Sequence, residues 1–375
     1  MGSSVSTKFN VAGVVLGSID ILTYVIVLNR LWDNLSVNNR RLSVLGARTA
    51  IFFPIYTSIM LISLLAPAGT TTCINTYIND NTTTTTTTTI IIIIIITTTT
   101  TTTNTDNEAN DILQVVIAVA EGFSMFCFLS LVIENLGGVR AAIGIQESTG
   151  EPLLCCGNKD YKQFYTNMYA RISMVMTVRP VIVLFQAVFM MLGERHPSNK
   201  AYKGISSILA LISAAILITA FISLATFYFS VMNHCANIYG TVKIFLLKIC
   251  VGAIVLQGLA ELVLAEYAPT TAQEDDWTGG TYKYLRVYCL LVLAEYALLT
   301  PLFYYAYGSK ISPRTLDSTR DDKVPPFDAA AYRPPLTFSD FLREIFSFSD
   351  TFKNLSYDKE SLLSPMSNDV VNRLE

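Results

Sequence analysis

The chain has 375 residues, of which 51% are apolar and 15% are charged, and its formal net charge is −3. Soluble domains carry roughly 25% charged residues, so this composition argues against a soluble globular protein. The balance of charge is slightly acidic, and no nucleic-acid partner is expected. The apolar residues come in long blocks, and a block of about 20 residues crosses ~30 Å of hydrocarbon as a helix.

Seven such blocks predict an all-α integral membrane protein with a seven-transmembrane helix bundle. The predicted spans are 9–29, 49–66, 112–135, 172–192, 205–231, 244–265 and 285–307. They form a transmembrane domain at 9–308, which follows a short N-terminal segment at 1–8 and precedes a tail at 309–375. The lipid bilayer is therefore the first partner that the sequence indicates.

The loops between the spans differ in their basic residues, and this difference indicates the orientation of the bundle. Lys and Arg gather in 30–48, 139–171 and 308–375, whereas 67–111 has none. Cytoplasmic loops carry the excess of basic residues, so we expect an external N-terminus and a cytoplasmic C-terminus. The basic loop at 194–204 opposes this orientation, because alternation of the spans places it outside.

A low-complexity Thr/Ile loop is predicted at 75–111. Threonine tracts at 82–89 and 97–103 flank seven isoleucines at 90–96. Seven residues are too few to cross a bilayer, so the stretch is interpreted as an insertion in an external loop, with a β-prone segment as the alternative. Asn81 begins an Asn-Thr-Thr sequon on the external side, which predicts a glycoprotein.

Cysteine and histidine side chains give few candidates for modification or metal binding. Cys155 and Cys156 are adjacent in a predicted cytoplasmic loop, where juxtamembrane acylation and two inert thiols explain them equally well. Gly2 fits an N-myristoylation consensus, which would favour a cytoplasmic N-terminus instead. Both histidines, His196 and His234, lie at or beyond the ends of spans, so no metal site and no cofactor is expected.

Ionisable side chains within the spans carry the most information about function, because a charge in hydrocarbon is costly. Asp20, Glu121 and Glu295 fall near the middle of their predicted spans. Arg179 lies roughly 10 Å from the predicted cytoplasmic end of the fourth span. These groups either pair with each other and hold the bundle together, or they line a polar path for a solute.

The predicted sixth span adds two polar candidates. Lys248 is shallow enough for its ammonium to reach the headgroups, and Gln257 shares one helix face with Glu261, four residues later. Prolines within spans permit kinks, and tyrosines there provide aromatic walls with a polar tip. These residues are Pro54, Pro180 and Pro301, and Tyr56, Tyr228, Tyr296, Tyr304 and Tyr305.

An ordered series of short motifs runs through the spans. It comprises Arg48-x5-Pro54-x-Tyr56, Glu121-x-Phe123-x4-Phe128-x8-Gly137-Gly138, Cys155-Cys156, Arg179-Pro180, Phe227-Tyr228, Lys243-x4-Lys248-x8-Gln257-Gly258 and Glu295. This series resembles the transmembrane protein 184 family. That family belongs with the alpha subunit of the organic solute transporter in one seven-span superfamily, and the resemblance covers residues 10–308.

The chain also departs from the family pattern. Val175-Met176 stands where the family has Gln-Tyr ahead of Arg-Pro, and Leu256 stands where it has tryptophan. Leu302 lies near the place of a family histidine, and the Thr/Ile tract is an insertion. These differences bear on the substrate more than on membership of the family.

The resemblance implies a transporter of organic solutes, such as amphipathic anions or steroid conjugates, that move by facilitated passage along a polar seam of the bundle. Arg179 and Lys248 would attract an anionic head, Glu121 and Glu295 would supply hydrogen bonds or a protonatable step, and tyrosines would cover the apolar body. The candidate solute-binding residues are Arg179, Glu121, Glu295, Lys248, Gln257 and Tyr56. The implied partners are an organic solute and either a single-span partner subunit or a second copy of the chain.

Two other classes of protein stay open from the sequence. A seven-transmembrane receptor would fit the span count, although Glu134-Asn135-Leu136 stands at the end of the third span where an Asp-Arg-Tyr is expected. A membrane trafficking or scaffold protein would act through its tail. An enzyme is not expected, because no catalytic motif such as Gly-x-Ser-x-Gly or His-Glu-x-x-His occurs in the spans.

The tail at 309–375 is mostly polar and is expected to be largely disordered. Apolar residues at helical spacing predict one amphipathic helix at 337–352, which could lie on the membrane or dock beneath the bundle. Asp358 with Leu362-Leu363 resembles an acidic dileucine sorting signal. The sequence therefore leaves the plasma membrane and the endosomal or lysosomal membrane as alternative locations.

Overall fold

The computed structural model describes residues 2–33, 40–65, 106–149, 161–196, 200–247, 249, 280–308 and 338–345. Within these ranges the regular elements are helices, and no strand is found among them. The elements are α1 (Gly2–Asp33), α2 (Arg40–Ala50), α3 (Phe52–Leu65), α6 (Asp106–Asn135), α7 (Val139–Thr149), α8 (Tyr161–Arg195), α9 (Lys200–Val231), the 3-10 helices η1 (Met232–His234) and η2 (Ala236–Ile238), α11 (Gly280–Gly308) and α12 (Phe338–Ile345). Residues 240–247 are also helical.

Six helical segments of the described chain are long and apolar enough to cross a membrane. They are Asn10–Asp33, Arg41–Ile62, Val115–Asn135, Tyr161–Gly193, Gly204–His234 and Cys289–Gly308. These segments confirm an all-helical membrane protein and overlap six of the seven predicted spans. The predicted span at 244–265 lies mostly outside the described residues, so the seventh crossing and the orientation of the termini stay predictions.

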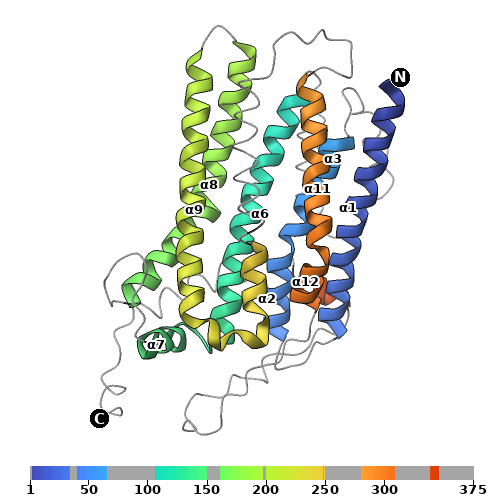
Figure 1. Ribbon diagram of the computed structural model, residues 1–375. Coiled ribbons are helices and arrows are strands. Elements are labelled where there is room, and N and C mark those ends of the chain that lie inside the picture. Colours follow the sequence, from blue (N-terminus) through green and yellow to red (C-terminus); the bar gives the residue numbers. More distant parts are fainter. Residues whose placement is uncertain are drawn as a thin grey trace, which may run out of the picture. The chain divides into compact units, whose positions relative to one another are not determined.

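The chain divides into two compact units, Met1–Pro334 and Pro335–Glu375. The first unit contains the membrane helices, and its arrangement is visible in Figure 1. Helix α8 packs along α9 and against α6, while α1 packs against α11 and α3. Helices α2 and α3 join these two groups, because both also contact α6. The second unit contains the short helix α12, which falls within the amphipathic stretch predicted for the tail.

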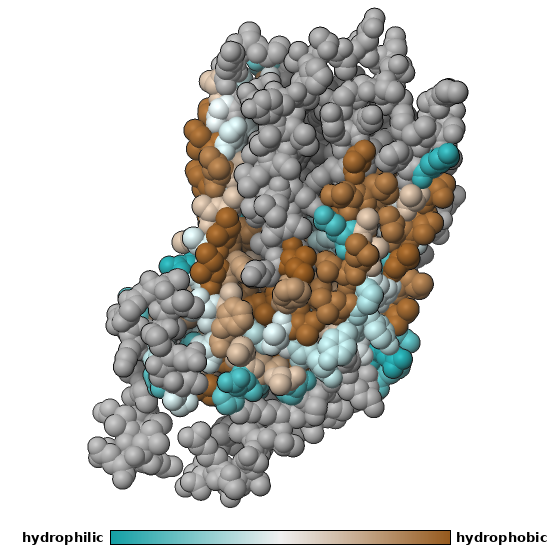
Figure 2. Space-filling view, in the orientation of Figure 1, coloured by the Kyte–Doolittle hydropathy of each residue, from teal (hydrophilic) through white to brown (hydrophobic). Residues whose placement is uncertain are grey.

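Helix α6 occupies the centre of this bundle, whereas α8 and α9 lie at its edge. In the most apolar window of α6, 83% of the residues are buried, compared with 28% in the corresponding windows of α8 and α9. The outward faces of α8 and α9 expose apolar side chains such as Leu184, Phe185 and Leu211. Figure 2 shows hydrophobic residues over much of the displayed face and hydrophilic residues towards the α7 end. Exposed apolar faces of this kind suit contact with lipid.

Two glycines explain how closely α1 approaches α3. A Cβ atom added at Gly13 would overlap Leu64 Cδ2, and one at Gly17 would lie 3.3 Å from Leu61 Cδ2. The two glycines are four residues apart, so they share one face of α1. Small residues at this spacing allow membrane helices to pack closely. Asp20 and Tyr24 continue the same face and are both buried.

The second predicted span is broken into two helices at Ile51. Pro54 has no N–H to donate to the carbonyl of Ala50, so the helical hydrogen-bond pattern is interrupted there. The chain crosses the break through Ile51 N, which donates to Arg48 O at 3.4 Å, and Ile55 N, which donates to Ile51 O at 3.3 Å. Pro180 and Pro301, by contrast, lie inside the continuous helices α8 and α11.

Two glycines end α6 and direct the chain into α7. Gly137 and Gly138 have φ angles of 90° and 103°, which are unfavourable for other residues. The amide of Gly138 donates to Ile133 O at 2.9 Å, which satisfies a carbonyl in the last turn of α6. Beside this turn, Asn135 and Asn237 exchange side-chain hydrogen bonds of 3.1 and 2.7 Å, which tie α6 to the segment after α9.

Candidate functional site

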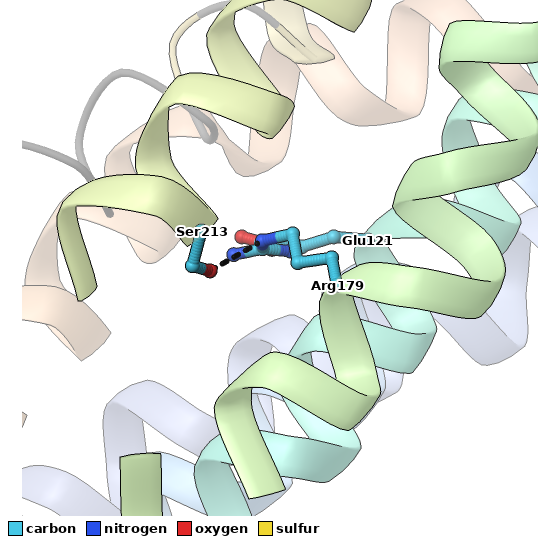
Figure 3. A network of polar contacts seen from close by, with 3 residues as sticks. All are labelled: Glu121, Arg179 and Ser213. Atoms are coloured by element: carbon cyan, nitrogen blue, oxygen red, sulfur yellow. Dashed lines mark hydrogen bonds and ion pairs between the residues drawn. The ribbon is translucent and has the colours of Figure 1, made fainter. Parts of the chain in front are cut away.

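A buried ion pair joins α6 to α8 in the interior of the bundle. Arg179 Nη1 contacts Glu121 Oε2, and the side chains of the two residues are 9% and 0% exposed. Arg179 Nε also donates a hydrogen bond of 3.2 Å to Ser213 Oγ of α9. Figure 3 shows the three side chains meeting between their helices. We refer to Glu121, Arg179 and Ser213 as the charged cluster.

The local sequence of α6 lets α8 come close enough to form this cluster. A Cβ atom at Gly122 would lie 2.9 Å from the carbonyl oxygen of Val175 and 3.0 Å from Met176 Cα. Real Cβ atoms essentially never approach other atoms within 3.0 Å. The residue after Glu121 must therefore lack a side chain, because the backbone of α8 occupies that space one turn before Arg179.

The charged cluster has hydrogen-bonding capacity that its members do not use. Glu121 Oε1 is buried and accepts no hydrogen bond from the described residues. A guanidinium carries five N–H donors, and Arg179 directs Nη1 to Glu121 and Nε to Ser213. A polar group that enters this position can therefore meet both an acceptor and a donor.

The pairing of opposite charges keeps the cluster neutral as a whole. Removing one partner of a buried ion pair leaves an uncompensated charge, which is strongly destabilising. Glu121 and Arg179 thus adopt one of the two arrangements that the sequence left open for ionisable groups in the spans, since they pair with each other. It also places the pair where three helices meet, so a change in the pair can affect the contacts of all three.

Tyr56 and Glu295 lie in a different part of the bundle, where α3 meets α11. Tyr56 is 1% exposed and stacks on Phe52 and Tyr296, with ring centroids 5.5 and 5.2 Å away. Phe53 and Phe303 extend this aromatic contact with centroids 4.4 Å apart. Glu295 precedes Tyr296 in α11 and is half-buried. The aromatic wall predicted from the tyrosines therefore forms mainly a packed helix contact in this conformation.

The remaining candidate residues lie outside the described part of the chain. They are Lys248, Gln257, Cys155, Cys156 and Asn81. Their roles in solute binding, acylation and glycosylation stay predictions. Among the described residues, no group of three or more His, Cys, Asp or Glu side chains could hold a metal ion. Cys127, Cys235 and Cys289 are buried, and none of the three takes part in a disulfide within the described chain.

Sequence reasoning did not identify Ser213 or a second arginine contact on the same helix pair. Arg171 Nη1 donates a 2.6 Å hydrogen bond to Ser223 Oγ of α9, about two turns from the charged cluster. Serines in an apolar helix give no signal of their own, because they can bond to the preceding turn as readily as to a neighbour. Only the packing of α8 on α9 shows which serines accept hydrogen bonds from the arginines.

Lys243 is a third basic residue whose environment the sequence did not reveal. Its side chain is fully buried just after η2, and Nζ donates to the carbonyl of Ile238. Nζ also lies 5.1 Å from the ring centroid of Tyr307 and 6.0 Å from that of Tyr239. These distances fit cation–π contacts, and they connect the start of the helix at 240–247 to the end of α11.

Comparison with known proteins identifies the family of the chain. Neither the curated proteins nor the solved structures include a match. A family model described as organic solute transporter Ostalpha matches residues 53–312, which cover the described chain from α3 to α11. This match confirms the superfamily that the ordered motifs indicated, while the transmembrane protein 184 branch stays a prediction. Because the matched region is more than half of the chain, the protein belongs to the organic solute transporter Ostalpha family, which is a family of membrane transporters and not of enzymes.

Proposed function

We propose that this chain carries amphipathic organic anions, steroid conjugates among them, across a membrane by facilitated movement past the charged cluster. The observation that supports this proposal most is the buried Glu121–Arg179 pair between α6, α8 and α9. Membership of a solute transporter family and an apolar helical bundle support the broader assignment to organic solute transport.

The proposed step is an exchange of partners at Arg179. The positive charge of Arg179 is already matched by Glu121, so a solute anion can be held there only if Glu121 gives up its contact or its charge. If Glu121 takes up a proton from water as the solute anion binds beside Arg179, the site keeps the net charge of the original pair. This exchange therefore avoids an uncompensated charge in the interior, which would cost on the order of several kcal/mol.

The other predicted contacts extend this path. Lys248 and Gln257 would add polar contacts from the predicted sixth span, and Tyr56 with Glu295 would cover the apolar body of the solute if α3 and α11 separate. We also place the chain in the transmembrane protein 184 branch, since its Arg-Pro and Lys…Lys…Gln-Gly motifs favour that branch. A single-span partner subunit or a second copy of the chain remains part of the proposal, as does residence in the plasma membrane or in an endosomal or lysosomal membrane.

Uptake of a labelled panel of organic anions, steroid conjugates included, into cells or vesicles that carry the protein tests this proposal. We expect saturable uptake by the natural chain and a loss of about tenfold or more in Arg179→Gln, which corresponds to about 1.4 kcal/mol. Arg171→Gln is the matched control, because Arg171 lies on the same helix and also bonds to a serine of α9. Both variants must reach the membrane in equal amount.

Four outcomes are informative. Uptake that falls only in Arg179→Gln supports the exchange of partners. An equal fall in both variants would attribute the effect to the packing of α8 on α9. Undiminished uptake in a correctly localised Arg179→Gln would refute the role of the charged cluster. No uptake of any anion, with or without a coexpressed single-span subunit, would favour the receptor or scaffold class over a transporter of these solutes.

A further inference from the structure

A second buried carboxylate lies where α1 meets α3 and α11. Asp20 of α1 is 8% exposed, and its two oxygens contact different helices. Thr57 Oγ1 of α3 donates to Asp20 Oδ2 at 3.2 Å, and Thr300 Oγ1 of α11 lies 2.9 Å from Asp20 Oδ1. We refer to Asp20, Thr57 and Thr300 as the aspartate cluster, in which the partners of the carboxyl group are hydroxyl groups.

No basic side chain of the described chain forms an ion pair with Asp20, in contrast to Glu121. The helices of this region also carry groups that can be charged, among them Tyr24 of α1, Arg48 of α2, Tyr56 of α3, and Glu295 and Tyr296 of α11. Tyr24 donates instead to the carbonyl of Ala47 at 3.5 Å. An ionised carboxylate in this position depends on two hydroxyl donors alone, whereas a protonated one carries no charge into the apolar interior.

The positions of the hydroxyl groups suit both protonation states of Asp20. Thr300 Oγ1 has one hydrogen but lies near two acceptors, Asp20 Oδ1 at 2.9 Å and the carbonyl of Tyr296 at 3.2 Å. When Asp20 is ionised, Thr300 and Thr57 can each donate to one carboxylate oxygen. When Asp20 is protonated at Oδ1, its O–H can donate to Thr300 Oγ1, and Thr300 can donate to Tyr296.

Each threonine hydroxyl therefore has an acceptor whether Asp20 is ionised or protonated. A buried carboxyl group without such partners would have a donor or an acceptor that forms no hydrogen bond. We propose that the aspartate cluster is a proton-binding site, in which Asp20 takes up a proton from water and returns it while Thr300 changes its acceptor. The proton is the ligand, and the carboxylate and carboxylic acid forms of Asp20 are the two states of the site.

The exchange of a proton at Asp20 changes the contact between α1 and α11. In the ionised state the hydroxyl of Thr300 points to another helix, and in the protonated state it points to the preceding turn of its own helix. Pro301 follows Thr300 and has no N–H of its own, so this part of α11 already has one fewer backbone hydrogen bond. The site thus links proton binding to the place where α11 is most easily bent.

Infrared difference spectroscopy of the full-length protein in lipid vesicles tests the proposal without a solute. The spectra are recorded in mildly acidic and mildly alkaline buffer, in the carbonyl region of protonated carboxylic acids. We expect a band that appears at acidic pH, shifts in heavy water and shifts again when the aspartates are labelled with carbon-13. Asp20 is the one aspartate within the seven predicted spans. The label therefore separates it from the glutamates of these spans, which are Glu121, Glu134, Glu261 and Glu295.

Two variants assign the band. Asp20→Asn should abolish it while keeping the volume of the side chain, and Glu121→Gln should leave it in place. Thr300→Val should shift its frequency, because the protonated carboxyl would lose its acceptor. Failure of Asp20→Asn to fold would leave the carbon-13 experiment on the natural chain decisive. The proposal would be overturned if the natural chain showed no pH-dependent aspartic acid band. It would also be overturned if the band persisted in a folded Asp20→Asn variant. Neither result depends on whether organic anions are transported.

Discussion

The charged cluster makes a quantitative prediction about stability. Arg179→Gln leaves the Glu121 side chain, which is fully buried, with no opposite charge among the described residues, and one of its oxygens already has no partner. Glu121→Gln leaves the buried guanidinium of Arg179 without the carboxylate that balances its charge. Breaking a buried pair by removing one partner costs about 3–5 kcal/mol, so we expect each single variant to lose stability on that scale.

The double variant Glu121→Gln, Arg179→Gln measures the interaction between the two residues apart from the loss caused by replacing each one alone. Two neutral amides leave no uncompensated charge, so the double variant should be more stable than the sum of the single losses predicts. Residues that contact each other directly show coupling energies of about 0.5–3 kcal/mol, and this pair should lie at the upper end. The measurement is reversible unfolding of the four proteins in mixed detergent micelles, with the free energy of unfolding compared around the cycle.

The reasoning would be refuted by a simple result. If Arg179→Gln lost less than about 1 kcal/mol, the pair would behave like an exposed ion pair. If the losses of the two single variants added in the double variant, Glu121 and Arg179 would act independently. The Arg171→Gln variant provides the baseline for removing an arginine from α8, since Arg171 bonds to a neutral hydroxyl group.

Three further predictions concern the surroundings of the cluster and the α7 end of the bundle. Gly122→Ala should destabilise the protein by about 1–3 kcal/mol in the same unfolding assay, because the added methyl group meets the carbonyl of Val175 at 2.9 Å. Ser213→Ala should cost about 1.5–3 kcal/mol through the lost bond to a charged donor. Thr219→Val on the same helix should stay within about 0.5 kcal/mol, because its hydroxyl bonds within α9, and equal losses would contradict the assignment. Asn135→Ala should open the junction between α6 and η2, and faster amide exchange there than in the natural chain would confirm it.

Sequence alone predicts the membrane helices well, because hydropathy measures the property that the bilayer selects. It cannot distinguish α6 from α9, since both are long apolar helices, although one is central and the other peripheral. It also does not show the break at Ile51, even though Pro54 was recognised, because Pro180 and Pro301 lie in unbroken helices. Whether a proline bends or breaks a helix depends on the contacts that hold the two sides.

The candidate site was predicted as a set of residues and not as an arrangement. Glu121 and Arg179 were both singled out from the cost of charges in hydrocarbon, and the structure brings them together. Asp20 stood out for the same reason but has hydroxyl partners and no cation in the described chain. The difference arises from which helix faces meet, and the rotation of a membrane helix about its axis is set by packing details that hydropathy does not record.

The two clusters differ in the kind of movement that they could permit. Arg171 holds α8 to α9 through Ser223, and the two helices pack extensively against each other. Among the described residues, the charged link from this pair to the centre of the bundle is Arg179 with Glu121. If a solute anion replaced Glu121, the link between α6 and α8 would weaken, while the link between α8 and α9 would remain. Under the proposed function, α8 and α9 should therefore move together against α6, and Asp20 would act on the opposite group of helices through α11. Distance measurements between spin labels on α6 and α9, and between labels on α8 and α9, can separate these movements, because only the first distance should change when the anion is added.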